Sequence, residues 1–100
     1  MFKIEKDLGH GWWHRTLWYK DEEMTILHRG DGPAIEWADG TKYWFLNGKR
    51  HRIDGPAGEA VDGDKEWWLN DQFMEFSEWK REVRQYYETD EDYLLMLLKL

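Results

Sequence analysis

The chain has 100 residues, which suits one domain near the lower limit of what a single hydrophobic core stabilises. It contains no cysteine, which excludes a disulfide, a thiolate metal site and a cysteine nucleophile. The net charge of −7 argues against a polymeric nucleic acid partner, because proteins gain affinity for duplexes by replacing counterions with Lys and Arg. Eight tryptophans, five tyrosines and four phenylalanines indicate that buried aromatic surface supplies much of the stability.

No signal-peptide pattern opens the sequence, and no run of about 18 apolar residues occurs in it. We therefore expect a cytoplasmic protein without a membrane partner.

The first 27 residues are less regular than the rest, and we expect them to form a degenerate N-terminal cap repeat. Within them, Trp18-Tyr19-Lys20-Asp21 resembles Trp44-Phe45-Leu46-Asn47 further along the chain. His10 and His14 have the spacing of two metal ligands on a helix, but Gly9 and Gly11 disfavour a helix and no further ligand is evident. We expect no metal and no cofactor.

Residues 28–48 and 51–71 are two copies of one sequence, HRGDGPAIEWADGTKYWFLNG and HRIDGPAGEAVDGDKEWWLND, which align without a gap at an offset of 23 residues. A short fixed period is typical of a supersecondary unit that buries its apolar face by stacking on its neighbours. We define repeat 1 as residues 28–50 and repeat 2 as residues 51–75.

Turn residues divide each repeat into short extended segments. Asp39-Gly40, Asn47-Gly48 and Asp62-Gly63 predict type I′ hairpin turns, and Asn70-Asp71 is a weaker version, because these residues tolerate positive φ. The extended segments expected between the turns are 34–38, 42–46, 49–52, 57–61, 65–69 and 72–75.

Comparison of the copies assigns the faces of these segments. Trp44 and Leu46 recur as Trp67 and Leu69, so we expect that face to form the core. The opposite face differs between the copies. Tyr43 and Phe45 of repeat 1 correspond to Glu66 and Trp68 of repeat 2, and Trp37 corresponds to Ala60. This face is either solvent-exposed, a partner surface or the place where a terminal helix docks.

The period changes in residues 77–100, which predict two helices. The first is expected over 77–88 with Ser77 as N-cap, and the second begins at Thr89 and ends near Lys99. Because the second is apolar on every side, we expect the rest of the chain to enclose it, or a second copy to cover residues 90–100 in a homo-oligomer. The expected fold is α+β: a single domain over 1–100 in which two C-terminal helices cap an antiparallel meander of short β-hairpins.

The string HRxDGPA followed by DGxKxWWLNG, over residues 28–73, resembles a tandem hairpin repeat of small bacteriophage proteins. The period of 23 residues also looks like that of the MORN repeat class, a likeness of architecture. The resemblance implies a phage accessory protein that acts in the cytoplasm of an infected bacterium, as an inhibitor of host defence or a binder of host components. It brings no catalytic residues with it.

The paired His and Arg that begin each repeat have two interpretations. They could clamp a phosphate, with the arginine as a bidentate donor. Alternatively Arg29 pairs with Asp31 or Glu36, and Arg52 with Asp54 or Glu59, to organise the repeat corner. Because both copies contain the acidic partners, we favour the second interpretation.

The aromatic residues also have two interpretations, as core and as ligand contacts. Most are expected to fill the core, whereas those at variable positions, beside the basic cluster at 49–52, would suit a nucleotide with its planar base and charged phosphate. The candidate ligand-binding residues are Arg29, Trp37, Tyr43, Phe45, Arg50, His51, Arg52 and Trp68.

No arrangement of catalytic residues is evident, so we do not expect an enzyme. The sequence predicts a non-catalytic binding protein that sequesters a host nucleotide immune signal as a phage counter-defence protein. The alternatives are a protein–protein inhibitor of a host defence or nucleic-acid-binding enzyme, and a structural repeat module.

Overall fold

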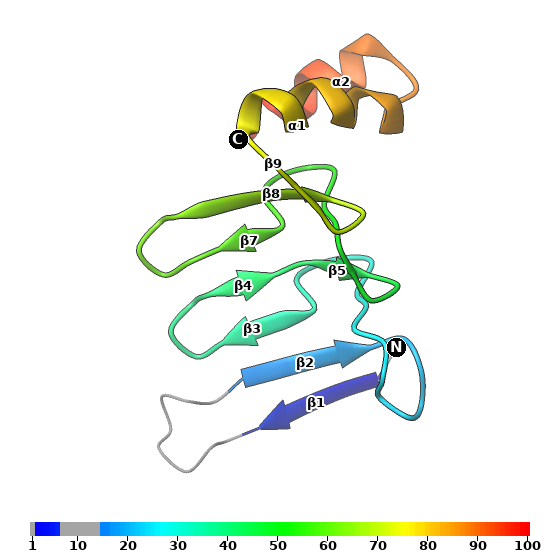
Figure 1. Cartoon of the computed structure of the whole chain (residues 1–100), viewed down its shortest axis with the longest axis vertical. Helices are drawn as coiled ribbons and strands as arrows, with labels where there is room; N and C mark the ends of the chain where they lie inside the picture. Colours follow the sequence, from blue (N-terminus) through cyan, green and yellow to red (C-terminus); the bar gives the residue numbers. More distant parts are fainter. Residues whose placement is uncertain (1, 7–14) are drawn as a thin grey trace.

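The computed structural model describes residues 2–6 and 15–100. It contains a seven-stranded antiparallel sheet in the order β1-β2-β3-β4-β7-β8-β9, a separate β5–β6 hairpin and two C-terminal α-helices, which is the expected α+β meander. The strands are stacked along the long axis, and the helices lie at one end, beyond β8 and β9 (Figure 1). The elements are β1 (Phe2–Lys6), β2 (Arg15–Tyr19), β3 (Ile35–Trp37), β4 (Lys42–Tyr43), β5 (Phe45–Leu46), β6 (Lys49–Arg50), β7 (Gly58–Glu59), β8 (Lys65–Leu69), β9 (Gln72–Met74), α1 (Phe76–Glu82), the 3-10 helix η1 (Val83–Tyr86) and α2 (Asp90–Leu97).

The turns Asn47-Gly48 and Asn70-Asp71 are confirmed as type I′ by their backbone angles. All four residues have positive φ, between 51° and 78°. These turns join β5 to β6 and β8 to β9, so they hold equivalent places in the two repeats.

The type I′ prediction is wrong for the turns at Asp39-Gly40 and Asp62-Gly63, where only the glycines have positive φ (100° and 94°). In the first of these turns the Gly40 amide donates to the Trp37 carbonyl, and the Trp37 amide donates to the Thr41 carbonyl. The loop therefore has three residues and a left-handed glycine at its end, a geometry in which only one position needs positive φ.

Trp44 interrupts the strand that was expected over 42–46. Its amide donates 2.8 Å to the carbonyl of Ala57, whereas the residues on either side belong to two different pairings, β4 with β7 and β5 with β6. The chain changes strand partner at this residue, and one expected strand becomes two short ones. The Trp18 amide donates in the same way to the Ala34 carbonyl at 2.8 Å.

Strand pairing defines two faces of the sheet. On one, which we call the Trp44 face, Glu36, Lys42, Glu59 and Lys65 are consecutive cross-strand neighbours of alternating charge. The other, which we call the Tyr43 face, carries a cross-strand row of mostly apolar residues. This row consists of Leu17, Ile35, Tyr43, Gly58 and Glu66.

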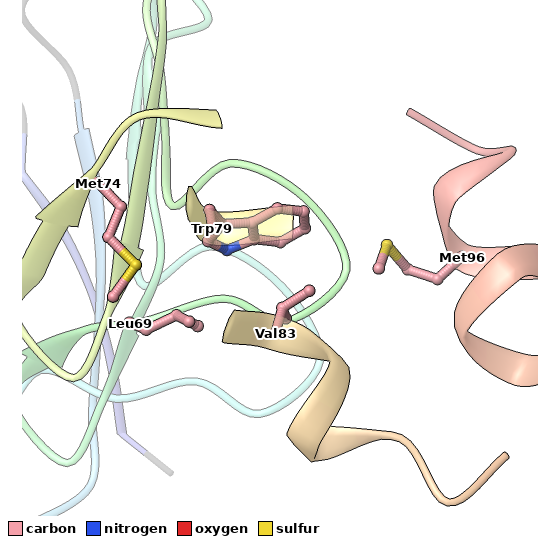
Figure 2. Close-up of a cluster of buried hydrophobic side chains, with 5 residues drawn as sticks. All are labelled: Leu69, Met74, Trp79, Val83 and Met96. Carbon is pink, nitrogen blue, oxygen red and sulfur yellow. The ribbon is translucent and has the colours of Figure 1, made fainter. Parts of the chain in front are cut away.

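The main hydrophobic cluster joins the helices to the last repeat. Trp79 of α1 and Val83 of η1 are fully buried, and Met96 of α2 packs against the same cluster from the other side (Figure 2). Leu69 and Met74 contribute from β8 and β9. Burial of each such side chain contributes about 1.5–3 kcal/mol, so the helices stabilise the C-terminal end of the sheet.

The first predicted helix differs from expectation at both ends. Residue Glu75, not Ser77, occupies the N-cap position, and no side chain caps the helix. After Glu82 the helix tightens into the 3-10 helix η1 and ends at Tyr86, two residues before the predicted end. The second helix begins as predicted, since Thr89 is the N-cap and its hydroxyl accepts from the Asp92 amide.

Only part of α2 is enclosed by the chain. Met96 is buried, and Tyr93 and Leu97 pack against the cluster. Leucines 94, 95, 98 and 100 remain exposed, Leu98 most of all at 82%. The homo-oligomer through residues 90–100 stays a prediction.

Candidate functional site

One arginine organises the corner at the start of repeat 2. The Arg52 Nε donates 2.9 Å to Asp54, and its Nη1 donates 3.0 Å to the carbonyl of Pro56 and 3.3 Å to Glu59. These are charge-assisted bonds within the corner, which is the arrangement that we favoured from the sequence.

Repeat 1 reproduces this geometry with Arg29. Its Nε donates 2.9 Å to Asp31, its Nη1 donates 3.3 Å to the Pro33 carbonyl, and Nη1 lies 3.6 Å from Glu36. The doubled sequence therefore corresponds to a doubled local structure, in which the arginines brace the corners.

Each corner arginine also covers a tryptophan that precedes it in the chain. The guanidinium carbon of Arg52 lies 3.8 Å from the ring centre of Trp44, and that of Arg29 lies 4.4 Å from the ring centre of Trp18. A Cβ added to Gly55 would lie 2.7 Å from the Arg52 guanidinium carbon. A side chain at this place in the corner would therefore force the arginine to shift.

The third tryptophan of this series, Trp67, is covered by α1 instead of by an arginine. Its ring lies 4.6 Å from both Phe76 and Trp79. Trp79 Nε1 also donates 3.1 Å to the carbonyl of Arg52. The first helix thus covers Trp67 at the position where a third repeat would supply a corner arginine.

The corner histidines accept hydrogen bonds and do not point to acid–base chemistry. His51, which is 8% exposed, accepts at Nδ1 from the Asn70 amide at 3.1 Å, and His28 accepts from the Asn47 amide at 2.9 Å. Burial lowers the pKa of His51 below its usual value, so the ring is neutral at neutral pH.

A cleft of about 1160 Å³ lies between the two repeat corners and the C-terminal helices. One wall is the corner from Arg29 to Pro33, and the opposite wall is formed by η1 and α2. Trp44 and Leu46 of the Trp44 face lie between these walls. The other lining residues are His51, Arg52, Ile53, Asp54, Tyr86, Tyr87, Asp92, Leu95, Met96 and Lys99.

The cleft coincides with a difference between the repeats at Gly30 and Ile53, which are equivalent positions. Ile53 packs against the buried cluster beneath the helices, whereas a Cβ added to Gly30 would meet nothing within 4 Å. The corner of repeat 1 therefore leaves open the space that a side chain fills in repeat 2.

Charges in the cleft are largely compensated. Arg29 and Arg52 face Asp31 and Asp54 through their Nε atoms, while the Nη2 atoms of both arginines have no hydrogen-bond partner among the described residues. Asp92 of α2 and Lys99, which follows α2, add one charge of each sign. Two guanidinium edges and one ammonium group are thus the cationic donors of the cleft.

The structure divides the eight candidate ligand-binding residues between the two faces. Three of them line the cleft: Arg29, His51 and Arg52. The other five lie on the Tyr43 face, namely Trp37, Tyr43, Phe45, Arg50 and Trp68, so the eight do not form one site.

Sequence reasoning missed several cleft residues. Tyr86, Leu95 and Lys99 reach the cleft through the packing of the helices, which no repeat comparison contains. Gly30 could have been found, because it is a variable position between the copies. Trp44 was assigned to the core, and the structure places it half-buried in the cleft.

Comparison with protein-family models, with curated proteins and with solved structures finds no match to this chain. Within residues 2–6 and 15–100, no three His, Asp or Glu side chains come together as metal ligands. His10 and His14 lie outside the described residues. None of the helices that the structure describes has the length and apolar character that a membrane crossing requires.

Proposed function

We propose that the protein is a non-catalytic binding protein whose cleft takes up a small ligand of the nucleotide class. The observation that carries this proposal is the cleft itself. It combines half-buried Trp44 and the Tyr86 ring with the guanidinium edges of Arg29 and Arg52. Ligand sites generally pair an apolar and aromatic lining with a few convergent polar groups.

The aromatic part of the lining suits a planar base. Trp44 lines the cleft with one face of its ring covered by Arg52, and Tyr86, which is 38% exposed, is held by a hydrogen bond from Asn70 Nδ2 at 3.0 Å. Base–aromatic stacking contributes about 1–3 kcal/mol per base. The cleft volume of about 1160 Å³ is ample for a nucleotide.

The cationic donors suit a phosphate. Planar guanidinium groups match phosphate oxygens, and the ion pairs and the tryptophan stacking hold both arginines in place before a ligand arrives. Since the local acids offset part of this charge, the site favours a compact ligand with few phosphates over a polyanion.

The resemblance of HRxDGPA to repeats of small phage proteins supports the biological part of the proposal. In that setting the ligand is a nucleotide immune signal of an infected bacterium, and the protein acts in the bacterial cytoplasm by sequestering it. No chemistry on the ligand is required for this role.

Thermal unfolding with a panel of linear and cyclic nucleotides tests the proposal. A ligand present at 100 times its Kd should stabilise the fold by about 2.7 kcal/mol. The matching nucleosides should stabilise it less, because they lack the phosphate. If no nucleotide raises the melting temperature, the proposal is wrong.

Substitutions at Gly30 test whether the ligand binds in the cleft. Gly30→Trp should fill the open space and abolish the shift, while Gly30→Ala should keep it, because a Cβ there meets nothing. Should Gly30→Trp unfold, Gly30→Ile decides the point, since repeat 2 has isoleucine at this position. An undiminished shift in the filled variant would overturn the assignment of the site.

A charge reversal at Lys99, just after α2, provides a second comparison. Lys99→Glu should weaken nucleotide binding by about tenfold, the effect of losing one hydrogen bond to a charged group. Lys80→Glu, an exposed position of α1 outside the cleft, makes the same change in net charge and should leave the affinity unchanged.

A further inference from the structure

The Tyr43 face contains two arginines whose side chains form no ion pair within the described part of the chain. Of the six arginines in the chain, Arg29, Arg52, Arg81 and Arg84 form ion pairs, whereas Arg15 and Arg50 form none with any described residue. The Nε atoms of Arg15 and Arg50 are buried and have no hydrogen-bond partner among residues 2–6 and 15–100. An unpaired buried donor lowers stability, and such groups in folded proteins call for an explanation.

Aromatic rings hold both guanidinium groups in place. Arg50 lies between Phe45 and Trp68, at 5.5 and 5.0 Å from their ring centres, and Arg15 lies 5.0 Å from the ring centre of Trp37. In each case only Nε is both buried and unpaired, so the terminal nitrogens remain open to solvent. These nitrogens are the donors that a bidentate carboxylate uses.

The rings form a row that is half-buried at Phe45, Arg50 and Trp68 and exposed at Phe73. Phe45, Arg50, Trp68 and Phe73 follow one another across β5, β6, β8 and β9, and the rings of Trp68 and Phe73 are 5.4 Å apart. Phe73 is 57% exposed. Aromatic residues and arginine are the types enriched where proteins bind other proteins.

The negative charge is shared between the helical end and the rest of the molecule. Residues 75–100 contain seven acidic and four basic residues, so −3 of the net charge of −7 lies in the helical end. In the pairing rows of the Tyr43 face the acidic residue is Glu66, and its carboxylate already accepts from Trp68 Nε1 at 2.9 Å. The Asp71 carboxylate accepts from the Arg50 backbone amide at 2.7 Å but forms no ion pair with the guanidinium group. The face therefore offers two guanidinium groups that form no ion pair with a described carboxylate.

We propose that the Tyr43 face binds an acidic segment of a partner protein, with carboxylates on Arg15 and Arg50 and apolar side chains along the aromatic row. The guanidinium groups are already ordered, so binding loses less side-chain entropy than it would with free arginines. This surface is separate from the cleft and does not depend on a nucleotide ligand.

A fluorescein-labelled peptide of alternating Glu and Tyr is the probe, and binding is measured by fluorescence anisotropy. Arg15→Gln and Arg50→Gln should each weaken binding about tenfold, which corresponds to the loss of one charged hydrogen bond. Arg81→Gln removes the same charge from an exposed site on α1 and should change nothing. Equal affinity of all three variants would overturn the proposal.

Two further probes test the chemistry of the ligand. The same peptide with Gln in place of Glu should bind at least tenfold more weakly, and an oligothymidylate of equal length should not compete. Competition by the oligothymidylate, or tight binding of the Gln peptide, would contradict an acidic protein partner. Because Arg15 and Arg50 lie on different strands, Arg15→Gln still decides the matter if Arg50→Gln unfolds the sheet.

Discussion

At the scale of single residues, each corner depends on an arginine that is fixed from several sides. Arg52 is held by Asp54, Glu59, the Pro56 carbonyl and the ring of Trp44. A side chain on Gly55 would force the guanidinium to shift away from these partners. The repeated glycine is therefore a packing requirement of the arginine.

Gly55→Ala should consequently destabilise the fold by about 1–3 kcal/mol, the usual effect of overpacking. The added Cβ would lie 2.7 Å from the guanidinium carbon and displace the arginine from its partners. Gly30→Ala, in the other corner, is the control and should be neutral or slightly stabilising. Urea unfolding measures both, and equal stability of the two variants would contradict this account.

His51 makes stability depend on pH. Burial lowers its pKa in the folded state, so the unfolded chain binds a proton more readily. The stability contribution is fully present above the unfolded-state pKa of about 6.5 and is lost as the pH falls through the lowered folded-state pKa.

His51→Asn keeps an acceptor for the Asn70 amide and should flatten the decrease in urea-unfolding free energy between pH 7.5 and 5. His28→Asn is the matched control. It should have a smaller effect, because His28 is less buried than His51. A larger effect at His28 would show that burial is not the cause.

At the scale of secondary-structure elements, the two helices differ in how they begin. The Thr89 hydroxyl caps α2, whereas Ser77 caps nothing in α1. Thr89→Ala should therefore cost about 1 kcal/mol of stability, and Ser77→Ala should change it by less than about 0.5 kcal/mol. Thermal unfolding of the two variants checks this difference, and a larger loss for Ser77→Ala would show that the cap is misassigned.

Local sequence predicted those elements whose cause is local. The turn at Asn47-Gly48 was predicted correctly because both residues tolerate positive φ, and Thr89 correctly predicted the start of α2. The strand over 42–46 was predicted without its break, since the break depends on a hydrogen bond from Trp44 to Ala57, in the next repeat. Periodicity also missed the tightening of α1 into η1.

At the scale of the whole molecule, repeat comparison identified variable positions but not the surface to which each belongs. Arg52 and Arg50 are two residues apart in the sequence, yet the first lines the cleft and the second lies on the Tyr43 face. The remaining wall of the cleft comes from η1, α2 and Lys99, which follows α2. Its position depends on packing between the helices and the sheet, which the repeat pattern does not encode.

The indole N–H signals of the tryptophans test the central claim most directly, because Trp44 lines the cleft whereas Trp37 and Trp68 lie on the opposite face. We expect a nucleotide that stabilises the protein to shift the Trp44 signal in a nitrogen–proton NMR spectrum and to leave those of Trp37 and Trp68 unchanged. Shifts of Trp37 and Trp68 with an unchanged Trp44 signal would contradict the claim that the cleft is the ligand site.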